Sequence, residues 1–190
     1  MEQRLLVIED SKPIARVIGQ IGMALNFQVT LATTLAQVEE LLQGDVEFFA
    51  ATIDYSLPDA HHGEAIDCVL SHGIPGVVMT GKMDDETRQD ILARPVIDYI
   101  PKENSQAFLY LKRILHSQLN NHQHGILVVD DSSSARNHIV ELLKRRNFSV
   151  YVAGNGVKAL EVLKQQPGIK MVITDLEMPE LDGLSLCRAI

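Results

Sequence analysis

The chain has 190 residues, 46% of them hydrophobic, so it is long enough to bury either one large core or two smaller ones. Its 17 lysines and arginines are outnumbered by 25 aspartates and glutamates, and the net charge of -8 argues against direct binding to nucleic acid or to an anionic membrane. Because no apolar segment approaches the ~20 residues of a membrane helix and the N-terminus shows no secretory signal, we expect a cytoplasmic protein.

Short apolar runs alternate with segments of helical period through residues 1–120. The runs predict strands at 5–8, 27–32, 48–53, 77–80 and 96–100. The segments that follow them predict helices at about 14–25, 35–42, 65–70, 84–93 and 106–119. Such alternation is typical of a parallel sheet with helices on both faces. Right-handed crossovers would wind the five units into a flavodoxin-like, doubly wound α/β fold with strand order 2-1-3-4-5.

The predicted helices carry apolar residues at i, i+3, i+4 and i+7, as on one helical face. In the first helix this stripe comprises Ile14, Val17, Ile18, Ile21 and Leu25. Thr34 and Gln37 have the spacing of a capping box at the start of the second helix. Cys68 and Cys187 lie in similar apolar patterns, so we expect buried thiols rather than a disulfide.

An internal repeat relates the two parts of the chain. The segment 4–11 reads RLLVIEDS and recurs at 125–132 as GILVVDDS, an offset of 121 residues. The same offset relates Asp54 to Asp175. The second part of the chain is therefore expected to repeat the fold of the first.

The domain boundaries follow from this repeat. Residues 121–124 are polar and without apolar periodicity, which predicts a linker. We predict a complete domain at 1–120 and the first half of a second copy at 125–190, because the second copy contains no counterpart of the fourth and fifth strands.

Polar side chains gather where the predicted strands end. Glu9 and Asp10 follow the first strand, Asp54 the third, Thr80 the fourth and Lys102 the fifth. The carboxyl ends of parallel strands converge on one crevice, so these groups should meet there. Clustered carboxylates repel one another unless a cation offsets them, and oxygen ligands favour Mg2+. Together with the lysine, such a site suits phosphoryl transfer to a carboxylate.

The arrangement resembles the receiver domain of bacterial two-component response regulators. The acid pair precedes the central aspartate by 44 residues in both copies, from Asp10 to Asp54 and from Asp131 to Asp175. The family's fourth and fifth strand ends are matched by VVMTG and DYIPKE, and its phosphorylation loop by DLEMPELDG in the second copy. The resemblance covers essentially the whole chain and identifies it as a tandem pair of receivers.

The resemblance implies a phosphoacceptor and a metal site. Asp54 would accept a phosphoryl group from a histidine kinase or a phosphotransfer protein. Asp10, Asp54 and the carbonyl of Ser56 would bind Mg2+ directly, and Glu9 would act through a water molecule. In the second copy, Asp130, Asp131 and Asp175 would fill the equivalent roles, with Glu177 supplying the carbonyl.

The resemblance also implies a switch. Thr80 and Lys102 would hold phosphoryl oxygens, and Tyr99 would be the aromatic residue that turns inward on activation; permanent burial of Tyr99 in its strand is the alternative. The surface of the fourth helix, fifth strand and fifth helix would then repack for homodimerisation or docking between domains. An output domain, for example a cyclic-di-GMP synthase of the GGDEF type, would lie outside this chain.

Two rival functions are open to test. One is an adaptor receiver that takes no phosphate. The other is a Mg2+-dependent phosphatase, which usually needs an aspartate at the position of Ser56. We expect no enzyme activity beyond slow self-dephosphorylation, tuned by Ser56 and Lys82. Glu103 stands where the family usually has proline, and one extra residue near His61 and His62 lengthens the adjacent loop.

Overall fold

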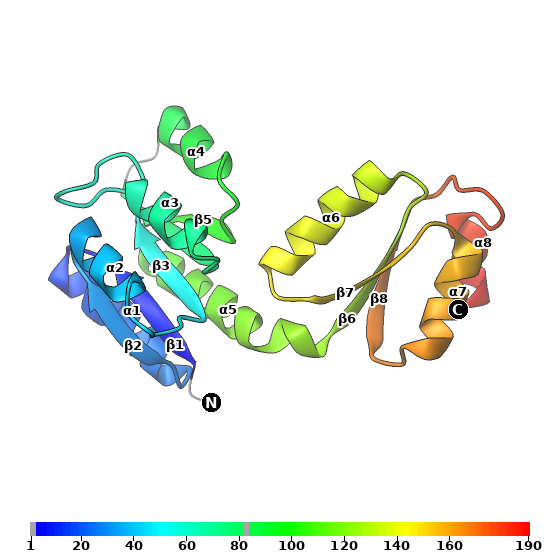
Figure 1. Ribbon diagram of the computed structural model, residues 1–190, viewed down its shortest axis with the longest axis horizontal. Coiled ribbons are helices and arrows are strands. Elements are labelled where there is room, and N and C mark those ends of the chain that lie inside the picture. Colours follow the sequence, from blue (N-terminus) through cyan, green and yellow to red (C-terminus); the bar gives the residue numbers. More distant parts are fainter. Residues whose placement is uncertain (1–2, 82–83) are drawn as a thin grey trace. The chain divides into compact units, whose positions relative to one another are not determined.

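The computed structural model describes residues 3–81 and 84–190 and divides into two compact units, Met1–His116 and Ser117–Ile190 (Figure 1). Strands and helices alternate strictly along the first unit. Its elements are β1 (Arg4–Ile8), α1 (Lys12–Ala24), β2 (Gln28–Ala32), α2 (Leu35–Leu42), β3 (Ala50–Asp54), α3 (Glu64–Ser71), β4 (Gly76–Thr80), α4 (Asp85–Leu92), β5 (Asp98–Pro101) and most of α5 (Ser105–Asn120). The last residues of α5, from Ser117 on, belong to the second unit.

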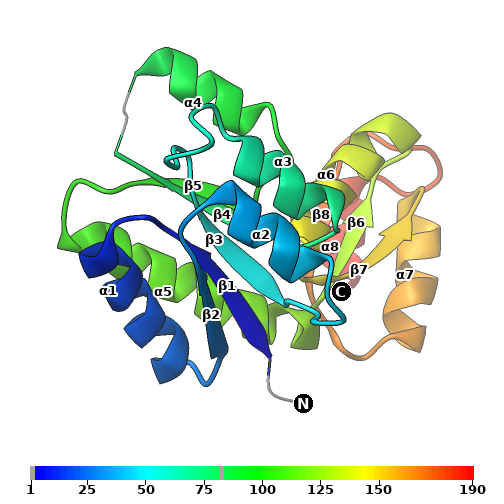
Figure 2. The same cartoon turned by 60° about the vertical axis from the view of Figure 1, so that its left-hand side comes forward.

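The five strands form one parallel sheet in the order β2-β1-β3-β4-β5, which confirms the predicted doubly wound fold. Every residue of β3 and β4 is buried, as expected of central strands covered on both faces. Helices α2, α3 and α4 lie over one face, where their apolar side chains join β1 and β3 in one core cluster (Figure 2). Helices α1 and α5 cover the other face (Figure 2).

Helix starts in the first unit follow local capping chemistry. The hydroxyl of Thr34 accepts a hydrogen bond from the backbone N–H of Gln37 at 3.3 Å, which confirms the predicted cap of α2. The side chain of Gln37 reaches back to the N–H of Thr33 at 2.8 Å. Asp84 caps α4 in the same way, accepting from the N–H of Thr87 at 2.8 Å.

The second unit repeats the first three strands of this topology. It contains a short 3-10 helix η1 (Asn121–Gln123), then β6 (Gly125–Val129), α6 (Ser133–Arg145), β7 (Ser149–Ala153), α7 (Gly156–Gln165), β8 (Ile169–Thr174) and α8 (Gly183–Ala189). Its parallel sheet has the order β7-β6-β8, as β2-β1-β3 has in the first unit. Asn26 and Asn147, one repeat apart, both adopt the left-handed conformation after their helices, with φ of 64° and 61°.

Two predicted side-chain environments are wrong. Val17 lies on the outer side of α1 with 39% of its surface exposed, because the close contact with the sheet is made by Ile18 and by the glycines on the same face. Cys187 is exposed on α8, whereas Cys68 is partly buried; both are free thiols. Among the helices of the described segments, none combines the length and apolar character that crossing a bilayer requires.

Candidate functional site

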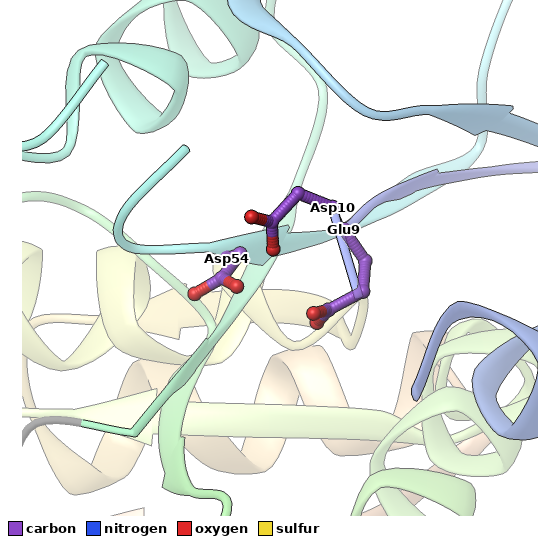
Figure 3. A group of neighbouring side chains, drawn as sticks. All are labelled: Glu9, Asp10 and Asp54. Carbon is purple, nitrogen blue, oxygen red and sulfur yellow. The ribbon is translucent and has the colours of Figure 1, made fainter. Parts of the chain in front are cut away.

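Three carboxylates lie at the ends of β1 and β3. Glu9 and Asp10 follow β1, and Asp54 is the last residue of β3. The two strands pair in parallel, with Ile8 opposite Ile53, so the residues that follow them lie side by side. Figure 3 shows the three side chains together, and each offers one oxygen within 4.8 Å of the others. The predicted convergence of these acids is therefore observed.

Lys102 extends from the end of β5 into this cluster. Its Nζ lies 2.6 Å from Oε2 of Glu9 and 2.6 Å from Oδ2 of Asp54. The side chains of the lysine and of Glu9 are 8% and 1% exposed, so the pairs are shielded from solvent. One ammonium group therefore offsets part of the negative charge of two carboxylates.

Burial dominates the ionisation of Glu9. Removal from solvent raises its pKa above the usual range, while the hydrogen bond and charge of Lys102 act in the opposite direction. The negative charge of Asp54 raises it further. Oε1 of Glu9 also accepts a hydrogen bond from the N–H of Ser11 at 3.3 Å. Asp10, by contrast, is exposed at the mouth of the site.

The other predicted residues of the first site lie on the same edge of the sheet. Thr80 ends β4 and is 1% exposed, and its carbonyl accepts from the N–H of Lys102 at 2.8 Å. The N–H of Ser56 lies 3.4 Å from Oδ1 of Asp54, so the loop turns back over the carboxylate. Tyr99 in β5 is partly buried and packs against the core cluster of the first unit. Lys82 lies outside the described residues.

The loop between β3 and α3 makes contacts that were not foreseen from the sequence. Asp59 accepts hydrogen bonds from the N–H groups of Leu35 and Ala36, at 2.8 and 3.1 Å, at the start of α2. Tyr55, directly after Asp54, donates its hydroxyl to Oδ2 of Asp90 in α4 at 2.9 Å. Neither pair has a sequence signal, because the partners lie 24 and 35 residues apart and share no periodic pattern.

A second acidic cluster lies at the corresponding place in the second unit. Asp130, Asp131 and Asp175 each offer an oxygen within 4.8 Å of the others. Oδ1 of Asp130 accepts from the N–H of Ser132 at 2.8 Å, which reproduces the contact between Glu9 and Ser11 one repeat earlier. Arg136 donates to the carbonyl of Asp130 at 2.6 Å. Glu177 is exposed on the loop after Asp175.

The donor atoms of both clusters fit a hard divalent cation. All of the clustered side chains offer carboxylate oxygens, the ligands that Mg2+ prefers, and in each cluster at least one acid is exposed to solvent. Mg2+ commonly keeps several water ligands and needs only one or two carboxylates. In the first cluster, Lys102 pairs with Glu9 and Asp54, and Asp10 makes no ion pair with any residue that the structure describes.

Comparisons with known proteins agree on one family. A family model of the response regulator receiver domain matches residues 126–190. The two-component response regulator ORR7 of Oryza sativa subsp. japonica is 42% identical over 65 residues, which cover 34% of this chain and 31% of that protein. The chain spans about a third to a half of the length of the curated response regulators that it matches.

Solved structures extend the similarity to both units. A structure assigned as a two-component system response regulator/GGDEF domain protein aligns with 99% of this chain and 76% of its own, at 34% identity and a TM-score of 0.86. The receiver domain of the sensor histidine kinase PA1611 from Pseudomonas aeruginosa PAO1, solved with a magnesium ion in its active site cleft, covers 60% of this chain and 95% of its own. At 24% identity and a TM-score of 0.52, the latter supports the fold alone.

Proposed function

The chain belongs to the response regulator receiver family, whose domains take part in phosphorelay signalling, and from this premise we propose that Asp54 is its phosphoacceptor. One observation carries the proposal: the carboxylate of Asp54 lies beside the exposed acid Asp10 and 2.6 Å from the ammonium nitrogen of Lys102. The donor would be a phosphohistidine of a kinase or of a phosphotransfer protein, in the cytoplasm.

The residues around Asp54 suit the transfer of a phosphoryl group. An oxygen of Asp54 would form a bond to phosphorus as the bond from phosphorus to the donor's imidazole nitrogen breaks, giving an acyl phosphate. Catalysis in such a transfer consists mostly of positioning and charge neutralisation. The Nζ atom of Lys102 already lies 2.6 Å from the accepting carboxylate and would bind one phosphoryl oxygen after the transfer. Thr80, at the end of the neighbouring strand β4, would donate its hydroxyl to another.

Asp10 and Asp54 would hold Mg2+ directly, with the carbonyl of Ser56, and Glu9 would contribute through a water molecule. The ion would neutralise the charge that develops on the phosphoryl oxygens. The donor chemistry of these side chains supports the assignment, since each supplies only oxygen ligands. Glu9 is the least accessible of them and is engaged by Lys102, which favours an indirect role.

Phosphorylation would change the surface formed by α4, β5 and α5. Thr80 would move toward the new charge and Tyr99 would fill the space it leaves. Helices α4 and α5 carry exposed large hydrophobic side chains, which are Leu92, Leu109 and Tyr110 at 54%, 53% and 43% exposure. We assign this surface to homodimerisation, and an increase in size with the phosphate mimic beryllofluoride, measured by light scattering, would support it. An unchanged size would count against it.

The second unit is assigned as the first three β/α units of another receiver, with Asp175 as acceptor and Asp130, Asp131 and Glu177 at the metal site. The shared strand order and the repeated contact of Asp130 with Ser132 support this assignment. The similarity over 99% of the chain to a response regulator/GGDEF domain protein makes a GGDEF-type output the first candidate for the downstream partner.

Intact mass measurement after incubation with acetyl phosphate and Mg2+ tests the proposal. The unmodified chain should gain phosphoryl groups, and Asp54→Asn should lose the one carried by the first unit. Asp175→Asn shows whether the second unit contributes a group of its own. Asp45→Asn, which removes an exposed acid outside the site, is the matched control and should be labelled normally. Full labelling of Asp54→Asn in the first unit would contradict the proposal, and omission of Mg2+ should abolish labelling.

A further inference from the structure

The residue after the proposed phosphoacceptor is tied to α4. Tyr55 is 5% exposed, and its hydroxyl donates to Oδ2 of Asp90 at 2.9 Å. Its ring packs against Gly63, where an added Cβ would lie 3.1 Å from Cε2 of the ring. The carbonyl of Tyr55 accepts from the N–H of Gly63 at 3.1 Å. Tyr55 is therefore fixed at its backbone, its ring and its hydroxyl.

Asp90 belongs to a longer chain of charged hydrogen bonds. Its Oδ2 also accepts from a terminal nitrogen of Arg94 at 2.6 Å. The remaining face of the Arg94 guanidinium binds both oxygens of Asp67 in α3, at 2.8 and 3.1 Å, and it donates to the carbonyl of His62 at 3.3 Å. Two-point contacts of this kind between arginine and carboxylate fix geometry as well as charge. The network thus joins α4 to α3 and to both ends of the loop after Asp54.

The ionisation of these groups keeps the network intact at neutral pH. The phenol of Tyr55 carries its proton at neutral pH, as an ordinary tyrosine does, and donates it to Asp90. Burial would raise the pKa of Asp90, but the hydrogen bonds from Arg94 and Tyr55 outweigh it and hold that pKa below its usual value. The acceptor therefore stays charged.

Helix α4 has few apolar contacts of its own. Its sequence, DETRQDIL, is mostly polar, and Thr87 and Ile91 are its buried residues. Ile91 is its contribution to the core cluster. Few apolar contacts and a polar sequence place a helix at the low end of local stability. Hydrogen bonds from Tyr55 to Asp90 and from Arg94 to Asp67 therefore add to the few contacts that hold α4 in position.

We propose that Tyr55 is a positioning residue that couples the state of Asp54 to the position of α4 through Asp90. The inference rests on the proposed function of Asp54. A movement of Thr80 toward a phosphoryl group would displace the start of α4, because Asp84, the N-cap of that helix, follows shortly after Thr80 in the chain. The bond between Tyr55 and Asp90 opposes that shift in the resting state. Because linkage is reciprocal, loss of the bond loosens α4 and also favours phosphorylation of Asp54.

A double-mutant cycle with Tyr55→Phe and Asp90→Ala tests the coupling in the full chain. Tyr55→Phe should speed amide hydrogen exchange of α4 about five-fold, as expected for one lost hydrogen bond, and should speed acetyl phosphate labelling of Asp54 by a similar factor. Asp90→Ala also removes the contact with Arg94 and should have a larger effect on exchange. The double variant should equal Asp90→Ala, because the bond from Tyr55 is already lost in that variant. Alanine favours helix more than aspartate does, so faster exchange in Asp90→Ala cannot come from lower helix propensity.

Tyr110→Phe provides the matched control. It removes another hydrogen bond between a tyrosine and an aspartate, from Tyr110 to Asp98 at 2.7 Å, and should change neither α4 exchange nor labelling. A merely structural role for Tyr55 would leave the labelling rate equal or lower, so a gain in rate is the specific readout. Two results would refute the coupling and leave the proposed function of Asp54 intact. One is additive effects in the cycle, and the other is unchanged α4 exchange in variants that are labelled normally. Absence of labelling in the unmodified chain would refute the function of Asp54 and the coupling with it.

Discussion

The Nζ atom of Lys102 lies 2.6 Å from Oδ2 of Asp54, although 48 residues separate the two in the chain. The same nitrogen contacts Glu9 at 2.6 Å. A buried ion pair contributes little net stability when complete, but removal of one partner leaves an uncompensated buried charge. The lysine therefore has a structural role in the resting protein as well as the proposed role in phosphate binding.

Replacement of this lysine should expose that structural role. In Lys102→Met without Mg2+, we expect the free energy of unfolding of the first unit to fall by about 3 kcal/mol at neutral pH, because Glu9 and Asp54 lose their cation. Millimolar Mg2+ should recover part of the loss, since the ion binds the folded cluster. Urea unfolding with and without the metal measures both effects.

Lys112→Met is the control for this change, because it removes an exposed lysine on α5 and should shift stability by no more than about 0.5 kcal/mol. Equal stability of the two variants would show that the ion pairs at Lys102 contribute nothing.

The fold and the acidic site could be predicted because both follow from local patterns and one topological rule. Apolar runs and helical stripes define the elements, and right-handed crossovers bring the carboxyl ends of the strands to one edge. Glu9, Asp54 and Lys102 then meet without any need for side-chain detail. The repeat adds independent support, since both copies obey the same spacing.

Other features lie beyond such patterns. The contacts of Tyr55 with Asp90 and of Asp59 with α2 depend on how loops turn and which rotamers fit, and neither leaves a periodic trace in the sequence. The exposure of Val17 and Cys187 was unpredictable for a similar reason. An apolar stripe predicts which face of a helix packs against the sheet, but it does not predict how wide a part of that face the sheet covers.

Asp59 should stabilise the first unit in a pH-dependent way. Hydrogen bonds from Leu35, and then from Ala36, hold the pKa of this exposed carboxyl below its usual value. Because the pKa of Asp59 is depressed in the folded state, its contribution to stability is complete above the pKa of ~3.9 in the unfolded chain. That contribution is lost as the pH falls through the pKa of the folded state. Asp59→Ala should therefore lower Tm at pH 7, and the difference from the unmodified chain should shrink in acid.

Asp45→Ala controls for the loss of one exposed acid that does not cap a helix. Thermal unfolding of both variants at neutral and acid pH makes the comparison. A difference that stays constant with pH would argue against the capping role.

Gly183 should tolerate no larger side chain. A Cβ at this position would lie 2.1 Å from the carbonyl oxygen of Asp175, and that contact involves backbone rather than a movable side chain. Gly183→Ala should thus displace the loop that carries Asp175 and destabilise the second unit by about 2 kcal/mol or more. Gly154→Ala places the same methyl group in open space and should cost no more than about 0.5 kcal/mol. Hydrogen exchange of the β6 and β8 amides measures the stability of the second unit separately from that of the first.

Gln118 should behave as part of the second unit, although it precedes the predicted linker at 121–124. It is 2% exposed, its side chain donates to the carbonyl of Arg145 at 3.0 Å, and its own carbonyl accepts from Asn147 at 2.7 Å. Arg145 ends α6, where the carbonyls have no partner within the helix. Gln118→Ala removes this donor and should lower the stability of the second unit by about 1 kcal/mol, seen as faster exchange of α6 amides. Gln123→Ala changes an exposed glutamine nearby and should have no such effect. If both variants left α6 exchange unchanged, the contacts of Gln118 would be dispensable and the second unit would begin after the predicted linker.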